Sequence, residues 1–306
     1  MINTLSLINK AVKEDTAGFI KSCEEEYKSR IAGIARQIAD NDDIKIVAIA
    51  GPSGSGKTTT AHILMKRLEE LGEKTDVVSL DDFYLPIGKM PILPDGNRDF
   101  ESVNALDLPC IERSFKSIIR NGVAMLPKFD FVTKTHIENA RKVDVGSRGI
   151  VIAEGLHALN PAVTGLVPEN NILKIYISVN VPIENESGEQ ILSSRQIRLA
   201  RRVLRDERFR AAPVTETLFL WSKVIEGESK YLYCFKNTAD IKLTTLHPFE
   251  PCVYREPFCR MRSSVNSGTP CYEYFIKTAN ALEQFAAVSS ESVPEDSLIR
   301  EFIGNK

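Results

Sequence analysis

The chain has 306 residues, of which 43% are hydrophobic and 26% are charged, and its formal net charge is −2. This length suits one large α/β domain or a domain with an appendage, and the composition is that of an ordinary globular protein. The nearly balanced charge provides no overall attraction to nucleic acid or to an anionic membrane, so neither is an expected partner. The six cysteines show no C-x-x-C spacing, which favours reduced thiols in a cytoplasmic protein.

In chain order, the pattern of apolar residues and breakers predicts helices that alternate with short strands. Residues 1–43 are predicted to form a polar helical lead-in on the outside of the core. Strands are predicted at 44–50, 75–80, 149–153 and 173–179, and helices at 58–71, 111–120, 189–208, 215–231 and 272–288. Residues 85–104 indicate a long surface excursion, and residues 239–271 indicate strands and loops. Such alternation predicts a parallel sheet with helices on both faces.

The most specific feature is the segment Gly51–Thr58, which has the pattern G-x-x-x-x-G-K-S/T. An apolar strand precedes it and a helix follows it, as a phosphate-binding loop requires. Its glycines and the helix N-terminus are suited to surround a polyphosphate with backbone N–H groups. The expected ATP-binding set is Gly51, Ser53, Gly54, Ser55, Gly56, Lys57, Thr58 and Thr59. In this set Lys57 reaches the β- and γ-phosphates, and the Thr58 hydroxyl ligates Mg²⁺.

Two carboxylates at strand ends complete the predicted chemistry. Glu154 ends a short apolar strand, where a carboxylate is suited to hold Mg²⁺ directly or through water. Asp81 and Asp82 end the neighbouring strand, and only one of them can face the ligand crevice. We expect Asp81 to face it and to accept the proton of an alcohol that attacks the γ-phosphate.

The predicted helix 189–208 carries arginines at spacings of three and four residues, which is one helical face. They are Arg195, Arg198, Arg202 and Arg205. A helix of this kind is suited to act as a lid that closes positive side chains over ATP and the transferred phosphoryl group. A helix that binds nucleic acid is disfavoured because no stacking aromatic residues are interleaved with the arginines. No guanine-reading Asn-Lys-x-Asp sequence is present, which argues against a GTPase.

These residues resemble the uridine kinase and phosphoribulokinase-like family of P-loop kinases. The matching segments follow the order of the family over about residues 44–240: Gly51–Thr58, Ser79–Tyr84, Phe100–Glu101, Ala105–Asp107, Pro127–Phe131, Glu154–Gly155 and Arg198–Asp206. The resemblance implies a P-loop kinase core over 44–240 with an arginine-rich lid helix, followed by a C-terminal α+β extension over 241–306. Residues 297–304 are similar to a larger bacterial-type uridine-kinase-like branch, whose extra N-terminal module this chain is not expected to carry.

The resemblance also implies roles for individual residues. Asp81 is the expected general base on the ribose 5′-hydroxyl, and Glu101 is the expected partner of the ribose 2′- and 3′-hydroxyls. The implied catalytic set is Asp81, Lys57, Arg198 and Arg202, with Arg205 on the phosphates of ATP. The implied substrate-binding set is Asp81, Tyr84, Glu101, Phe129, Phe131, Lys134 and Arg198.

The base-reading positions differ from those of familiar members of the family. Phe129 stands where the family usually has a tyrosine, and Lys134 stands where it has a histidine. The expected activity is therefore an ATP- and Mg²⁺-dependent phosphorylation of a small alcohol, with the 5′-hydroxyl of uridine or cytidine as the first candidate. A kinase for another sugar-like or pantothenate-like alcohol and a regulatory nucleotide-binding protein without turnover are the alternatives. The sequence leaves the oligomeric state open, a homo-oligomer included.

Overall fold

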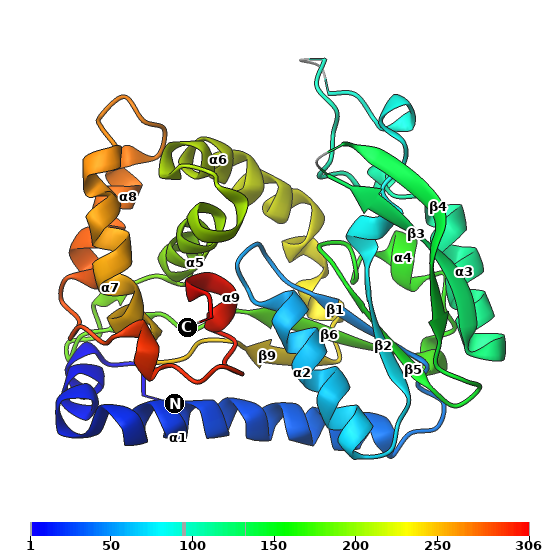
Figure 1. The fold of residues 1–306 in the computed structure, drawn as a ribbon, viewed down its shortest axis with the longest axis horizontal. Helices are drawn as coiled ribbons and strands as arrows, with labels where there is room; N and C mark the ends of the chain where they lie inside the picture. The colour runs from blue at the N-terminus through cyan, green and yellow to red at the C-terminus, as the bar shows by residue number, and fades with distance from the viewer. Residues whose placement is uncertain (1, 94–95, 132, 306) are drawn as a thin grey trace.

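A computed structural model describes residues 2–93, 96–131 and 133–305. Its centre is a five-stranded parallel sheet in the order β2-β5-β1-β6-β9 (Figure 1). The strands are β1 (Ile46–Ala50), β2 (Thr75–Ser79), β5 (Ile150–Glu154), β6 (Ile172–Ser178) and β9 (Ile241–Thr244). The four strands predicted from apolar runs are confirmed, each to within two residues at either end, and so is the parallel sheet.

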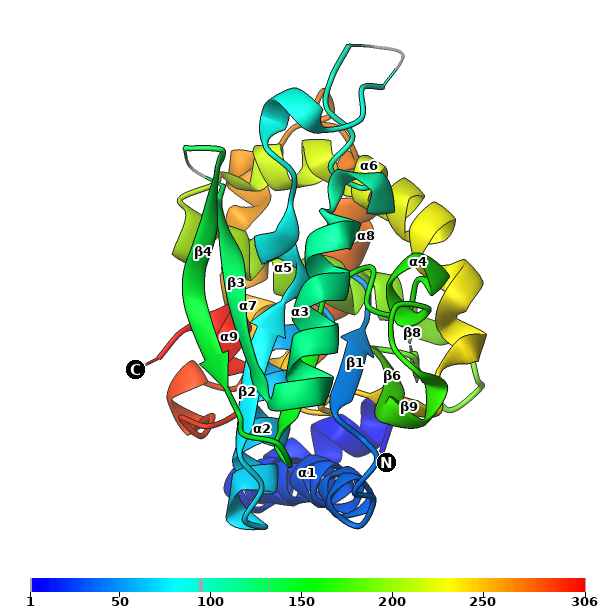
Figure 2. The ribbon, with the colours of Figure 1, turned by 90° about the vertical axis from the view of Figure 1, so that its right-hand side faces the viewer.

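Helices cover both faces of this sheet because successive residues of a buried strand point to opposite sides. Val47 and Ile49 of β1 pack into one core cluster with α1 (Leu5–Ala39) and α2 (Lys57–Glu70). Ile46 and Ala48 pack into a second cluster with α3 (Leu108–Asn121). The long helix α1 runs beneath the sheet in Figure 1, and α3 lies at the other face in Figure 2.

A hairpin outside the main sheet is a part of the fold that the sequence did not predict. Strands β3 (Val123–Asp130) and β4 (Thr135–Asp144) pair in an antiparallel two-stranded sheet beside α3 (Figure 2). The predicted end of α3 is confirmed, because Gly122 adopts the left-handed backbone conformation that ends the helix. The chain then enters β3 directly.

The arginine-rich helix begins later than its sequence pattern indicates. It is α5 (Ser194–Arg210), which starts at a capping box formed by Ser193 and Gln196. Residues Gln190–Leu192 form β8 instead, paired with β7 (Ile183–Glu184). Nine of the 17 residues of α5 are buried, so this helix is packed into the core rather than laid over the surface. Helix α6 (Val214–Tyr231) follows, as predicted.

The C-terminal part differs most from the prediction. Within residues 239–271, predicted as strands and loops, the structure contains the helix α7 (Glu250–Arg260). Pro251 lies in the first turn, where proline is tolerated, and Pro257 in the interior lowers the helix propensity, but buried side chains such as Tyr254 and Phe258 hold α7 against the core. The predicted final helix ends early, as α8 (Tyr272–Leu282), and the short α9 (Arg300–Ile303) comes last. A single turn of helix, α4 (Pro161–Thr164), follows β5.

The N-terminal helix and the C-terminal helices share one hydrophobic core with the sheet. Ile20 of α1, Ile175 of β6 and Phe275 of α8 belong to the same buried cluster. In the described part of the chain, every helix is too short or too polar to cross a lipid bilayer.

Candidate active site

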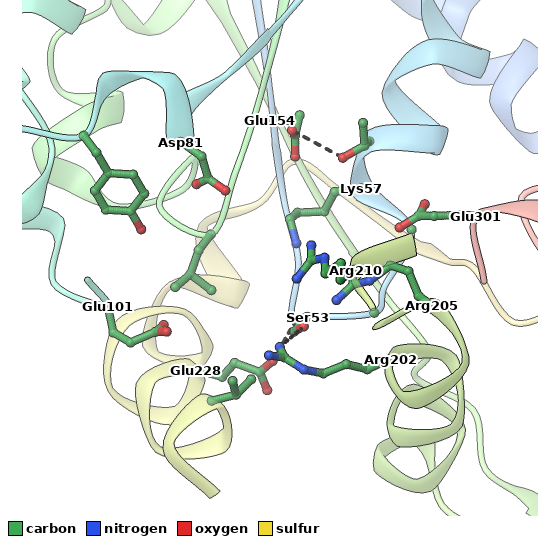
Figure 3. A pocket seen from close by; sticks show the side chains of 16 residues that line it. Ser53, Lys57, Asp81, Glu101, Glu154, Arg202, Arg205, Arg210, Glu228 and Glu301 are labelled. Atoms are coloured by element: carbon green, nitrogen blue, oxygen red, sulfur yellow. Dashed lines mark hydrogen bonds between the residues drawn. The ribbon is translucent and has the colours of Figure 1, made fainter. Parts of the chain in front are cut away.

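A polar cavity of about 240 Å³ lies at the carboxyl ends of β1, β2 and β5. This is the edge at which parallel α/β sheets bind their ligands. Figure 3 shows Lys57 at its centre, with Asp81 and Glu101 to one side and the arginines of α5 to the other. Five carboxylates and four cationic side chains line it: Asp81, Glu101, Glu154, Glu228 and Glu301, with Lys57, Arg202, Arg205 and Arg210.

The phosphate-binding loop joins β1 to α2 and forms the floor of this cavity. Gly54 and Gly56 have φ angles of 72° and 83°, which L-residues with a side chain rarely adopt. The loop is closely packed from outside, since a Cβ added to Gly54 would lie 3.0 Å from the backbone oxygen of Arg198. The Lys57 ammonium donates to the carbonyl oxygen of Pro52 at 3.4 Å, within the loop itself. The loop is therefore preformed around its lysine.

Glu154 and Thr58 meet next to this loop. The Thr58 hydroxyl donates to Oε1 of Glu154 at 3.4 Å, and the side chain of Glu154 is buried. Burial raises the pKa of this carboxyl, while the Lys57 charge acts in the opposite direction. A hydroxyl and a carboxylate are hard oxygen donors of the kind that Mg²⁺ takes, usually together with water and phosphate oxygens. The two residues therefore fit a magnesium ion.

Asp81 and Asp82 diverge as the sequence suggests. Asp81 lines the cavity and is open to its solvent, but protein atoms surround the rest of the carboxyl and raise its pKa by desolvation. The charge of Lys57 opposes this rise, and the charge of Asp82 adds to it. Asp82 itself is directed to the hairpin, where burial raises the pKa of its carboxyl, while a hydrogen bond from the Phe129 backbone and the Lys128 charge act in the opposite direction.

Tyr84 and Glu101 form the side of the cavity that lies away from the arginines. The Tyr84 hydroxyl donates to the carbonyl oxygen of Phe100 at 2.7 Å. The Glu101 backbone N–H donates to the Asp99 carboxylate at 3.1 Å, which fixes this stretch of chain. Burial raises the pKa of the Glu101 carboxyl, and the Arg202 charge acts against it. Gly227 of α6 lets this side chain approach, because a Cβ there would lie 2.9 Å from its Oε2.

The predicted base-contacting residues stand behind Tyr84 rather than in the cavity. Phe129 and Phe131 have their ring centroids 5.5 Å and 5.7 Å from that of Tyr84. Phe129 is buried, whereas Phe131 at the tip of the hairpin is 53% exposed. Lys134 also lies at this tip, exposed and with a φ of 55°. An aromatic surface therefore adjoins the cavity, with Tyr84 as the contact between the two.

The arginines of α5 divide between the cavity and the core. Arg202 donates to the Ser53 hydroxyl at 2.7 Å and lines the cavity together with Arg205. Arg201 is fully buried and donates to the Gly54 carbonyl oxygen at 3.1 Å. Arg198, predicted to be catalytic, does not line this cavity and is buried in an ion pair. The helix therefore forms one wall of the site, and its closure as a lid over bound ATP stays a prediction.

A family model described as the phosphoribulokinase / uridine kinase family matches residues 46–247. This chain belongs to that family. Curated relatives include uridine-cytidine kinase B of Dictyostelium discoideum, 24% identical over 197 residues that make up 64% of this chain and 72% of that protein. A uridine kinase of Staphylococcus aureus is 24% identical over 198 residues, 64% of this chain and 85% of its own length. A solved structure described as a possible uridine kinase from Bacillus stearothermophilus aligns with a TM-score of 0.49 and 19% identity. The alignment covers 71% of this chain and 99% of that one.

The cavity of this P-loop kinase also contains residues that the sequence did not single out. Glu228 of α6 accepts a hydrogen bond from the Ser53 backbone N–H at 2.7 Å. Glu301 of α9 accepts one from the Thr59 hydroxyl, and Arg210 ends α5 at the mouth of the cavity. Glu228 and Glu301 are distant from the loop in the chain, and no spacing rule connects them with it. Arg210 belongs to the same arginine-rich segment as Arg198, Arg202 and Arg205, and this density is the one sequence signal that could have found it.

Of the predicted site residues, the structure brings one group into the cavity and leaves another outside its lining. Inside are Ser53, Gly54, Gly56, Lys57, Thr58, Asp81, Tyr84, Glu101, Glu154, Arg202 and Arg205. Outside are Gly51, Ser55, Thr59, Phe129, Phe131, Lys134 and Arg198. The first group combines a polyphosphate cradle, a candidate base and oxygen ligands for a cation, which are the parts of a phosphoryl-transfer site.

Proposed function

We propose that this member of the family is a Mg·ATP-dependent kinase that phosphorylates the 5′-hydroxyl of uridine or cytidine. The observation that carries the proposal is the presence of Lys57 and Asp81 in one cavity, together with Glu101. A phosphate-binding lysine after β1 and a carboxylate after β2, with only β5 between these strands, can hold donor and acceptor on either side of the reacting phosphorus.

In this proposal the side chains of the cavity catalyse the reaction mainly by neutralising charge on the phosphates and by positioning the acceptor hydroxyl. Lys57, Arg202 and Arg205 neutralise the charge that develops on the transferred phosphoryl group. Magnesium, held by Thr58 and Glu154, would supply further positive charge on the phosphate oxygens. Asp81 orients the acceptor hydroxyl and takes its proton, a role for which its raised pKa makes it a better base than an exposed aspartate.

The acceptor side of the cavity supports a substrate with several hydroxyl groups. Glu101 is a half-buried carboxylate that can accept two hydrogen bonds from neighbouring hydroxyls, as ribose offers. The exposed ring of Phe131, which packs against Tyr84 and the buried Phe129, offers an aromatic surface next to it. A nucleoside would then place its sugar at the carboxylates and its base toward the hairpin.

The test is ADP release with Mg·ATP against uridine, cytidine, purine nucleosides, simple sugars and pantothenate. Asp81→Asn is expected to abolish phosphoryl transfer while leaving ATP binding largely intact. Asp82→Asn is the matched control, since it removes the same charge from a side chain directed away from the cavity. Retained turnover in Asp81→Asn would contradict the assignment of the base.

The panel also separates the alternatives. Turnover on uridine or cytidine alone supports the proposed acceptor. Turnover confined to another alcohol keeps the mechanism and replaces the substrate. ATP binding without turnover on any member of the panel contradicts the proposal and supports a regulatory nucleotide-binding protein.

A further inference from the structure

A second cavity, of about 430 Å³, lies on the far side of the buried Arg198–Glu228 pair from the active site. We call it the rear pocket and define it by its four cationic side chains, Arg195, Arg198, Lys236 and Lys242. Tyrosine, serine and asparagine side chains complete its polar lining, and among its described lining residues there is no aspartate or glutamate. Its volume falls in the range of small-molecule sites, about 300–1,000 Å³.

The charge of the rear pocket is not cancelled by the protein. Among the ion pairs of residues 2–93, 96–131 and 133–305, none includes Arg195, Lys236 or Lys242. The Lys242 ammonium donates to the side-chain oxygen of Asn237, a neutral residue that also lines the pocket, at 2.8 Å. A chain with a net charge of −2 therefore gathers three uncompensated cations around one hollow. Such a group attracts a compact anion of more than one negative charge.

The Arg198–Glu228 pair separates the two cavities. Arg198 lines the rear pocket, and its Nη1 donates to both carboxylate oxygens of Glu228 at 2.9 Å. Glu228 lines the active site, where its Oε1 accepts the Ser53 N–H of the phosphate loop. Both side chains are almost completely buried. A change in the charge around Arg198 therefore acts on the phosphate loop through one intervening side chain.

We propose that the rear pocket binds a phosphate monoester as a regulatory ligand, at a site separate from the one that transfers phosphate. The phosphate of the ligand contacts Arg195, Lys236 and Lys242 and competes with Glu228 for Arg198. Weaker pairing leaves the negative charge of Glu228 less neutralised beside the phosphate loop, where it repels the phosphates of ATP, so the occupied protein binds ATP less tightly. By linkage, ATP weakens the binding of the ester by the same factor. This inference does not depend on which alcohol the active site phosphorylates.

The test uses the full chain carrying Lys57→Ala, which weakens phosphate binding in the active site. Inorganic phosphate and adenosine 5′-monophosphate serve as probes in isothermal titration calorimetry. Into this background we place Lys236→Glu with Lys242→Glu, and as a matched control Lys10→Glu with Lys13→Glu on α1, which changes the net charge equally at a remote exposed surface. We expect at least a tenfold loss of probe affinity in the rear-pocket variant and little change in the control.

Two further results decide between specific and adventitious binding. In the chain with Lys57 intact, adenosine 5′-monophosphate is expected to raise the KM for ATP, and Lys236→Glu with Lys242→Glu is expected to reduce this effect. Absence of probe binding to the Lys57→Ala chain would overturn the proposal. So would an equal loss of affinity in the rear-pocket variant and in the control, because the probe would then sense only the overall charge.

Discussion

The phosphate-loop side of the active site is backed by packed helices, whereas its acceptor side is built from an irregular segment and a separate hairpin. On the first side, α5 lies directly against Gly54, and Arg201 and Glu228 bind backbone groups of the loop. On the second, His136 of β4 contacts the Tyr84 carbonyl oxygen at 2.8 Å, and the aromatic group joins the hairpin to the cavity. Under the proposed function, phosphoryl transfer depends on the packed helices, while recognition of the acceptor depends on the irregular segment and the hairpin.

The largest expected effect is a loss of stability on the phosphate-loop side, caused by Arg201→Met. Arg201 has no exposed surface and donates from its Nε to Glu250, which is also fully buried. Removing one partner leaves an unpaired buried charge, which costs about 3–5 kcal/mol of unfolding free energy. Chemical denaturation measures this loss.

The neighbouring Arg202→Met is the matched control for this change. Its side chain faces the cavity, so we expect a small effect on stability and a large loss of turnover. Adding Glu250→Met to Arg201→Met is expected to recover part of the stability, because both buried charges are then absent. Equal destabilisation by Arg201→Met and Arg202→Met would contradict the division of α5 into a structural and a functional side.

The next effect concerns the acceptor side alone. Glu101→Gln removes a charged acceptor, and hydrogen bonds to charged groups contribute about 1.5–3 kcal/mol. We expect the KM for the acceptor to rise by about tenfold to a hundredfold, with the KM for ATP nearly unchanged. Steady-state kinetics with each substrate varied separately measures the two values. A parallel rise in both would show that the two sides of the site are not independent.

A smaller effect is expected from Gly227→Ala, and it should act in opposite directions on stability and activity. Alanine favours a helix interior by about 1 kcal/mol relative to glycine, so the free energy of unfolding should not fall. The new methyl group would lie 2.9 Å from Oε2 of Glu101 and would displace that carboxylate. We expect a rise of several-fold in the acceptor KM, measured beside thermal unfolding. An unchanged KM would show that Glu101 does not need its present position.

The smallest predicted effect is a displacement of the pH profile. A general base works only when deprotonated, and desolvation raises the pKa of Asp81. The kcat/KM value should therefore fall, as the pH decreases, at a higher pH than an ordinary aspartate would give. Asp82→Asn removes a negative charge that raises this pKa further. We expect the acid limb of the pH profile of this variant to move to lower pH. If the limb does not move, it reports the titration of a group other than Asp81.

The sequence predicted the phosphate-loop side well because local patterns determine it. A strand, a glycine-rich loop and a helix follow one another directly, and Asp81 and Glu154 mark the ends of adjacent strands. Spacing along α5 also placed its arginines on a helix correctly. It did not reveal that Arg198 and Arg201 would be buried, because burial depends on the packing of α6 and α7, which the periodicity of α5 does not contain.

The acceptor side and the C-terminal part were harder to predict for a different reason. The hairpin β3–β4 is mostly exposed along β4, so it lacks the apolar alternation that indicates a half-buried strand. Helix α7 contains two prolines, so its helix propensity does not predict it. Its stability comes from the burial of its side chains in the folded protein. Glu228 and Glu301 reach the phosphate loop from distant segments through tertiary contacts. Their contribution could not be found without the structure.

In the described structure the two strands of the hairpin β3–β4 pair only with each other and not with a strand of the five-stranded sheet, to which Arg141 of β4 is joined by its side chain. Substitutions or changes in length at its tip therefore leave the register of the catalytic sheet untouched. An evolving lineage could exchange this one unit and acquire a new substrate while keeping its chemistry. Under the proposed function, the segment around Phe131 and Lys134 is accordingly the place to begin randomisation when a different alcohol is wanted.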